Sequence, residues 1–206
     1  MCCRYYIEPA NPELLSIAEA AEHTKLMERF RRAAAQGMQS RGEITPSMIV
    51  PVIAWSKSGG RAYFPMKWGY HVERKNLLAN ARLETAAVKP VFQESWKSHR
   101  CIIPASYYFE WEHFLRPNGK KETGEKYLLQ PKGAQITWLC GLYRLENGLP
   151  HFVILTRPPG EGISYIHDRM PLLLEEKDVE SWINPACSPD EIAYRAVTDL
   201  YFQKAG

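Results

Sequence analysis

The hydrophobic and polar positions of this chain follow mostly the pattern of β-strands. Short apolar or aromatic runs separated by turn residues occur at 4–8, 62–64, 100–105, 107–111, 127–129, 136–143, 152–156 and 172–174, and a further strand ends at Trp55. Runs of this length, rich in β-branched and aromatic residues, indicate a sheet of many short strands. Asn147-Gly148 lies between two runs and is typical of a two-residue hairpin turn.

Apolar positions at helical spacing occur in fewer places. Asn11-Pro12 is an N-cap followed by proline at the first helical position, and it precedes one long helix over residues 14–33 that Gly37 ends. Shorter helices are expected at 84–87, around 178–182 and after Ser188-Pro189-Asp190, where Ser188 is expected to act as the cap. The pattern predicts an α+β fold in one domain, with a bent, barrel-like antiparallel sheet and flanking helices.

Composition narrows the class of protein. The chain has 206 residues, 45% of them hydrophobic, which suits one well-cored domain. Neither a membrane-spanning run nor a signal-peptide pattern is present, so a soluble cytoplasmic monomer is expected. The net charge of +3 neither requires nor excludes nucleic acid. The five cysteines lack metal-ligand spacing; Cys101 and Cys140 are expected to be buried thiols, and no metal or cofactor is expected.

Cys2 offers the most distinctive chemistry in the chain. Removal of Met1 would leave Cys2 with a free α-amine and a thiol on adjacent carbons. Such a 1,2-aminothiol condenses with an aldehyde and closes a five-membered thiazolidine ring. Unperturbed pKa values of about 8 for the amine and about 8.5 for the thiol make both groups usable near neutrality. The alternative is that Cys2 is the second residue of a frayed terminus.

Two residues are candidates for moving the protons that this chemistry requires. Glu110 is the one acid in the apolar run 106–111, where burial would raise its pKa and suit it to proton transfer. His167 precedes Arg169-Met170-Pro171 and is a second candidate. The alternatives are that Glu110 faces solvent and that His167 is a surface or structural histidine.

Asn80, Arg82 and Trp68 are candidates for binding a substrate. Asn80 and Arg82 alternate in an extended segment, so they can project to one face, and an amide with a guanidinium suits a sugar-phosphate. Trp68 beside Gly69 is able to stack on a base, although an isolated tryptophan is more often a core residue. Loop capping and a surface ion pair are the alternative for Asn80 and Arg82.

Five motifs in a fixed order carry a family resemblance. The chain resembles the SOS response-associated peptidase (SRAP) family from residue 1 to about 174, with the helices of 175–206 following. The motifs are Met1-Cys2-Cys3-Arg4; Trp68-Gly69; Asn80-Ala81-Arg82-Leu83-Glu84; Arg100-Cys101-Ile102-Ile103-Pro104-Ala105 with Phe109-Glu110-Trp111; and Ile166-His167-Asp168-Arg169-Met170-Pro171.

The resemblance implies a DNA damage response protein that binds single-stranded DNA at abasic sites and is nucleoid-associated when bound. Cys2, freed of Met1 by itself or by an aminopeptidase, would form a Schiff base and then a thiazolidine crosslink. Asn80 would position the linkage, Glu110 would move protons, and His167 would assist sugar ring opening and crosslink reversal. DNA contacts are expected from Arg4, Pro46, Trp68, Arg82 and Arg169.

Cys3 departs from the family pattern, which has glycine at this position. A side chain there crowds the approach of DNA or adds a second thiol.

Two other functions remain open on the residues alone. One is a non-covalent reader of modified DNA, in which Cys2 is dispensable. The other is an amidohydrolase or autopeptidase in which Cys2 is the nucleophile and its own amine is the base.

Overall fold

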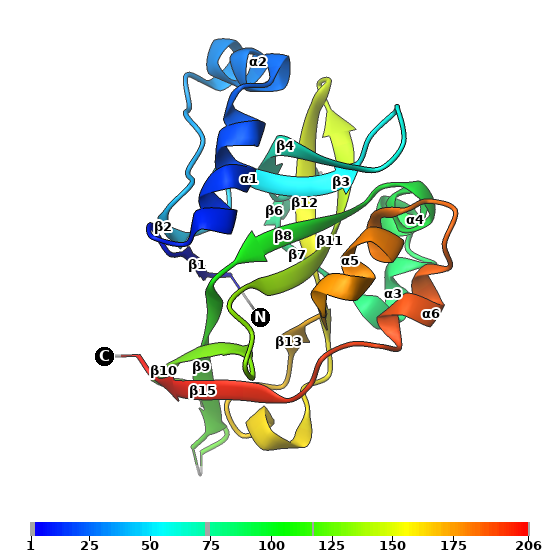
Figure 1. Ribbon diagram of the computed structural model, residues 1–206. Coiled ribbons are helices and arrows are strands. Elements are labelled where there is room, and N and C mark those ends of the chain that lie inside the picture. The colour runs from blue at the N-terminus through cyan, green and yellow to red at the C-terminus, as the bar shows by residue number, and fades with distance from the viewer. Residues whose placement is uncertain (1–2, 73–74, 117, 206) are drawn as a thin grey trace.

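The protein is described by a computed structural model that covers residues 3–72, 75–116 and 118–205 (Figure 1). Strands dominate the centre, and the helices lie on the outside in two groups, α1 with α2 on one side and α3 to α6 on the other. The predicted α+β fold is confirmed. Within the described residues, no helix is long and apolar enough to cross a membrane.

The larger sheet forms a barrel. Its path β12-β4-β3-β8-β11 closes because β11 also pairs with β12. Most pairings are antiparallel, as predicted, but β12 runs parallel to β4 and to β7. Its strands are β3 (Ile49–Trp55), β4 (Arg61–Trp68), β7 (Asn80–Arg82), β8 (Arg100–Ala105), β11 (Thr137–Glu146), β12 (Leu149–Arg157), β13 (Met170–Pro171) and β14 (Leu173–Leu174).

A second sheet lies beside the barrel and carries the N-terminal strand. Its order is β15-β10-β9-β1-β2. The strands are β1 (Tyr5–Ile7), β2 (Gly42–Ile44), β9 (Tyr107–Leu115), β10 (Lys121–Pro131) and β15 (Leu200–Lys204), and a separate pair is formed by β5 (Tyr70–Val72) and β6 (Lys75–Leu78). β15 was not predicted. Because β1 pairs with β9, the first described residues are held next to the run that contains Glu110.

The predicted helix over residues 14–33 is two helices. α1 (Pro12–Glu22) is capped by Asn11 as expected, and α2 (Lys25–Ala34) begins after Thr24. The Thr24 side chain accepts from the backbone N–H of Met27, so a second N-cap interrupts the apolar pattern. Ala35, in the left-handed conformation, ends α2 in place of the expected Gly37.

The remaining helices are short. They are α3 (Leu83–Ala86), α4 (Pro90–Ser98), α5 (Glu176–Ile183), α6 (Pro189–Ala193) and the 3₁₀ turn η1 (Glu161–Ile163). α3, α4 and α5 pack on strands of the barrel, and α6 packs on α5. α4 was not predicted. Ser188 occupies the N-cap position of α6 as expected, but its side chain makes no capping hydrogen bond. Cys101 and Cys140 are buried free thiols, as predicted.

Candidate active site

Glu110 and His167 form a buried pair between the second sheet and the segment after η1. His167 Nε2 lies 3.2 Å from Glu110 Oε1, and the two side chains are each 6% exposed. The solvent-facing alternative for Glu110 and the surface alternative for His167 are therefore wrong. A carboxyl group and an imidazole at this distance are within hydrogen-bond reach, which is the geometry that general acid–base chemistry requires.

Backbone pairing brings these two residues together from distant parts of the chain. Glu110 lies on β9, opposite Tyr127 of β10. The amide N–H of His113, further along β9, donates to the carbonyl of Ile166 at 3.0 Å. This bond ties the segment that carries His167 to the strand that carries Glu110.

Two neighbours act on His167 Nδ1 in opposite directions. The backbone N–H of Arg169 donates to Nδ1 at 2.9 Å, which favours the neutral ring with the hydrogen on Nε2, pointing at Glu110, whereas Asp168 Oδ1, 2.9 Å from the same Nδ1, favours the protonated ring. Burial lowers the pKa of His167 to about 4. Burial likewise raises the pKa of Glu110 to about 7. Glu110 is thus the group of the pair that gains and loses a proton near neutral pH.

Asn80 lies close to the N-terminal segment. Its Nδ2 donates to Cys3 Sγ at 3.6 Å, while its buried Oδ1 has no hydrogen-bond partner among the residues that the structure describes. Desolvation raises the pKa of the Cys3 thiol, although the Asn80 hydrogen bond opposes this effect. Met1 and Cys2 lie outside the described residues, so Cys2 remains a sequence-based prediction. Cys3, the first residue that the structure describes, lies beside Asn80.

The three predicted arginines differ in their surroundings. Arg4 forms an ion pair with Glu43 and lies over the Trp111 ring, 5.7 Å from its centroid. Arg82 is exposed. Arg169 makes two hydrogen bonds to the Glu84 carboxylate, at 2.6 and 2.9 Å, and its side chain is 12% exposed. A phosphate that reached Arg169 would therefore compete with Glu84.

Trp68 and Pro46 complete the predicted set. Trp68 is fully buried, and its indole N–H donates to the Ala79 carbonyl at 2.8 Å. The core interpretation of Trp68 is therefore correct in this conformation, and the ring offers no surface on which a base can stack. Pro46 is half-buried in the turn before β3, beside Ser47, which has a φ of 78°.

Sequence reasoning missed two neighbours of His167. The His113 ring lies 4.5 Å from the His167 ring, centroid to centroid, and Asp168 Oδ1 lies 2.9 Å from His167 Nδ1. The predicted strand stopped at Trp111, whereas β9 continues past His113. An extended strand prediction would have placed His113 on the same strand as Glu110, but no pattern indicated that it contacts His167.

Fold and site together define the class of protein. It is an α+β barrel protein with a buried acid–base pair beside its N-terminal strand, an arrangement suited to proton-transfer chemistry at the start of the chain. Residues 1–203 match the family SOS response associated peptidase (SRAP). The chain belongs to this family, as the motif order predicted.

Curated relatives agree with this assignment, and a solved structure shares the fold. The chain is 38% identical over 113 residues to abasic site processing protein YobE of Bacillus subtilis, covering 52% of this chain and 49% of YobE. It is 33% identical over 135 residues to abasic site processing protein YedK of Escherichia coli, covering 62% and 57%. These matches span about half the length of the relatives. A Bacteroides thetaiotaomicron protein of 22% identity has the same fold, with a TM-score of 0.71 over 100% of this chain and 92% of that one.

Proposed function

We propose that this protein processes abasic sites in DNA as part of a DNA damage response. It binds single-stranded DNA at the lesion and forms a thiazolidine crosslink through Cys2 after Met1 is removed. The observation that carries the proposal is the buried Glu110–His167 pair, because a carboxyl with a pKa of about 7 is suited to accept and donate a proton at neutral pH. The similarity to abasic site processing proteins of Bacillus subtilis and Escherichia coli supports the choice of an abasic site as substrate.

The proposed reaction first forms a Schiff base, by addition and loss of water, and then closes the thiazolidine ring. The α-amine of Cys2 adds to the aldehyde of the ring-opened sugar to give a carbinolamine. Protonated Glu110 then gives its proton to the carbinolamine hydroxyl, which leaves as water and produces an iminium ion. The Cys2 sulfur next bonds to the iminium carbon, and the thiol proton returns to Glu110. The net reaction joins the aldehyde to the aminothiol, releases one water and restores the carboxyl group.

The neighbouring residues take supporting roles in this scheme. His167 holds Glu110 through its Nε2–H and, with the carboxyl, assists sugar ring opening and crosslink reversal. The unpartnered Oδ1 of Asn80 is an acceptor for the hydroxyl or the amine at the linkage. The thiol of Cys3, with its raised pKa, stays protonated near neutral pH and so does not compete with Cys2 as a thiolate.

Binding of the single-stranded DNA relies on charge, because an abasic site has no base for the protein to recognise. Arg82 is exposed, and Arg4 is partly exposed beside Trp111, so both are available to phosphates near the site. Arg169 contributes if a phosphate displaces Glu84. Trp68 is not needed as a stacking surface.

The test is a denaturing gel of the protein mixed with single-stranded DNA that carries one abasic site. The wild-type protein should give a heat-stable shifted band, and Cys2→Ala should not. A Cys3→Ala variant is the matched control and should retain the band. Equal behaviour of wild type and Cys2→Ala would refute the proposal and favour a non-covalent reader. Turnover of an amide substrate without DNA would favour an amidohydrolase instead.

A further inference from the structure

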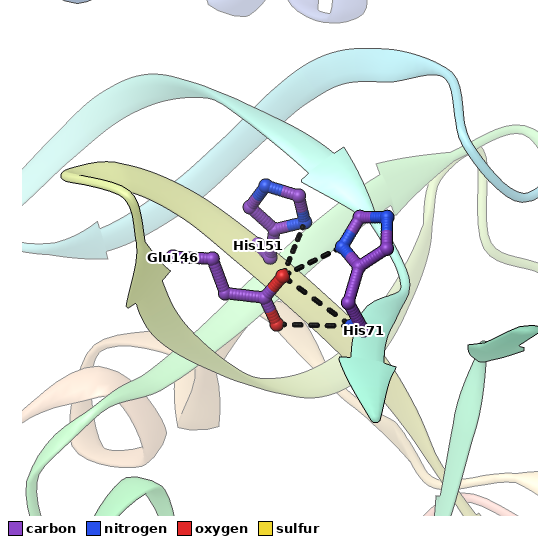
Figure 2. Close-up of side chains that lie close together, drawn as sticks. All are labelled: His71, Glu146 and His151. Carbon is purple, nitrogen blue, oxygen red and sulfur yellow. Dashed lines mark hydrogen bonds and ion pairs between the residues drawn. The ribbon is translucent and has the colours of Figure 1, made fainter. Parts of the chain in front are cut away.

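A second group of potential metal ligands lies outside the candidate active site. His71 is on β5, Glu146 is the last residue of β11, and His151 is on β12. One ligand atom from each lies within 4.8 Å of the other two. Figure 2 shows both imidazole rings turned toward the same carboxylate oxygen. The candidate acid–base chemistry uses none of the three.

The local fold explains why these side chains converge. The Asn147-Gly148 turn, with φ values of 51° and 76°, joins β11 to β12 and brings Glu146 beside the strand of His151. The backbone N–H of Gly69 donates to the Phe152 carbonyl at 2.7 Å, which holds the start of β5, and with it His71, against β12. Three segments with a sequence separation of up to 80 residues are thereby fixed around one point.

The distances between the donors resemble those of a coordination shell. His71 Nδ1 lies 2.7 Å from Glu146 Oε2, and His151 Nδ1 lies 3.5 Å from the same oxygen. Bonds of about 2.0–2.1 Å in a tetrahedral zinc site place neighbouring ligand atoms about 3.3 Å apart. Small side-chain shifts are therefore enough to accommodate an ion between the three donors.

The surroundings orient the carboxylate and leave a route to solvent. Arg144 donates from Nε and from its terminal nitrogen to Glu146 Oε1, at 2.9 and 2.7 Å, so that Oε2 faces the imidazoles. Partners of this kind fix ligands in metal sites. His151 is 8% exposed and Glu146 is 14% exposed, whereas His71 is 59% exposed. The exposed side gives an ion access and leaves a position for water.

We propose that His71, Glu146 and His151 bind one divalent transition-metal ion of the Zn²⁺ class, with water as a further ligand. Two imidazoles and one carboxylate suit Zn²⁺, whereas Mg²⁺ and Ca²⁺ prefer oxygen ligands throughout. The Nδ1 hydrogen of His71 now points toward Glu146, and that of His151 donates to the Gly69 carbonyl at 2.9 Å. An ion would replace both hydrogen bonds, because in a neutral imidazole the hydrogen moves to Nε2 when Nδ1 binds a metal. The ion would tie β5 to the β11–β12 hairpin. The positive charge of the neighbouring Arg144 lowers the affinity of the site for a cation.

The experiment is calorimetric titration of ZnCl₂ into the purified, metal-stripped protein, with His71→Ala and Glu146→Gln as test variants. His23→Ala, which changes an exposed histidine between α1 and α2, is the control. Wild type and His23→Ala should bind one equivalent with the same affinity, and each test variant should bind about 100-fold more weakly or not at all. Circular dichroism confirms folding of each variant; His71→Gln replaces His71→Ala if the latter unfolds.

A Co²⁺ spectrum separates this site from the N-terminal thiols, which also bind metals. The proposed site should give the visible bands of a low-coordinate Co²⁺ site without thiolate-to-metal charge transfer, and His71→Ala should abolish those bands. A spectrum that consists of thiolate charge transfer alone and is unchanged in His71→Ala would overturn the proposal. So would the absence of binding in the wild type, or equal affinities in His71→Ala and His23→Ala. The proposal is independent of abasic-site chemistry.

Discussion

Glu110→Gln should stabilise the protein at alkaline pH while it removes the proposed proton carrier. The pKa of Glu110 is raised from 4.5 to about 7 because the carboxyl is buried. The folded protein therefore holds this proton more tightly than the unfolded chain. The stability that protonated Glu110 contributes is complete below pH 4.5 and is lost as the pH rises through about 7.

The size of the change in unfolding free energy follows from the pKa shift of Glu110. A difference between 4.5 and about 7 corresponds to about 3 kcal/mol of unfolding free energy. Glutamine has nearly the same shape, its amide oxygen accepts from His167 Nε2–H, and it carries no charge. We therefore expect the stability of Glu110→Gln relative to wild type to increase by about 3 kcal/mol between pH 4.5 and pH 8.5.

Urea denaturation at these two pH values measures the effect. Glu112→Gln, which changes a more exposed carboxylate on the same strand, is the control and should show a much smaller dependence on pH. A stability difference between Glu110→Gln and wild type that is equal at both pH values would refute the reasoning. In the gel assay, crosslinking by Glu110→Gln should be slower by about 10²- to 10⁴-fold at pH 7.

Three further predictions concern the framework. His167→Gln should lose less stability than wild type as the pH falls from 6.5 to about 4, because in that range His167 takes up a proton in the unfolded chain but not in the folded protein, where burial lowers its pKa. Urea midpoints of both proteins at pH 7 and pH 4.5 measure the difference. Gly69→Ala should destabilise by more than about 1 kcal/mol, because Gly69 has a φ of +113° and an added Cβ would lie 2.5 Å from Leu77 Cγ; an equal shift in the thermal midpoint for Gly162→Ala, where the space is open, would contradict this. Arg100→Met should cost about 3–5 kcal/mol in urea, because buried Arg100 donates to the carbonyls of Trp96, Lys97, Trp182, Asn184 and Cys187; a loss below about 1 kcal/mol would contradict it.

Local signals in the sequence predicted the elements better than their pairing. Three predicted features depend on a few adjacent residues, and each is confirmed: the Asn147-Gly148 turn, the N-cap at Asn11 and the strand that carries Glu110. The break at Thr24 was missed because the apolar spacing continues through it. The parallel pairing of β12 with β4 and β7 joins distant segments, which no local pattern reveals.

The same division applies to the functional residues. The position of Glu110 in an apolar run left both a buried and a solvent-facing orientation open, and in the structure Glu110 is buried. Its contact with His167 depends on how β9 meets the segment after η1, which residue spacing does not encode. The cluster of His71, Glu146 and His151 was missed for a similar reason. Its members come from three strands, so they show no short ligand spacing in the sequence.

The most direct test of the central claim is the intact mass of the product formed with an oligonucleotide that contains one abasic site. After heating, we expect a species whose mass equals the protein without Met1 plus the oligonucleotide minus one water, and no corresponding adduct of the Cys2→Ala protein. A heat-stable adduct of the Cys2→Ala protein with the oligonucleotide minus one water, or an unmodified wild-type protein after incubation of the Met1-free form with the oligonucleotide, would contradict the thiazolidine mechanism.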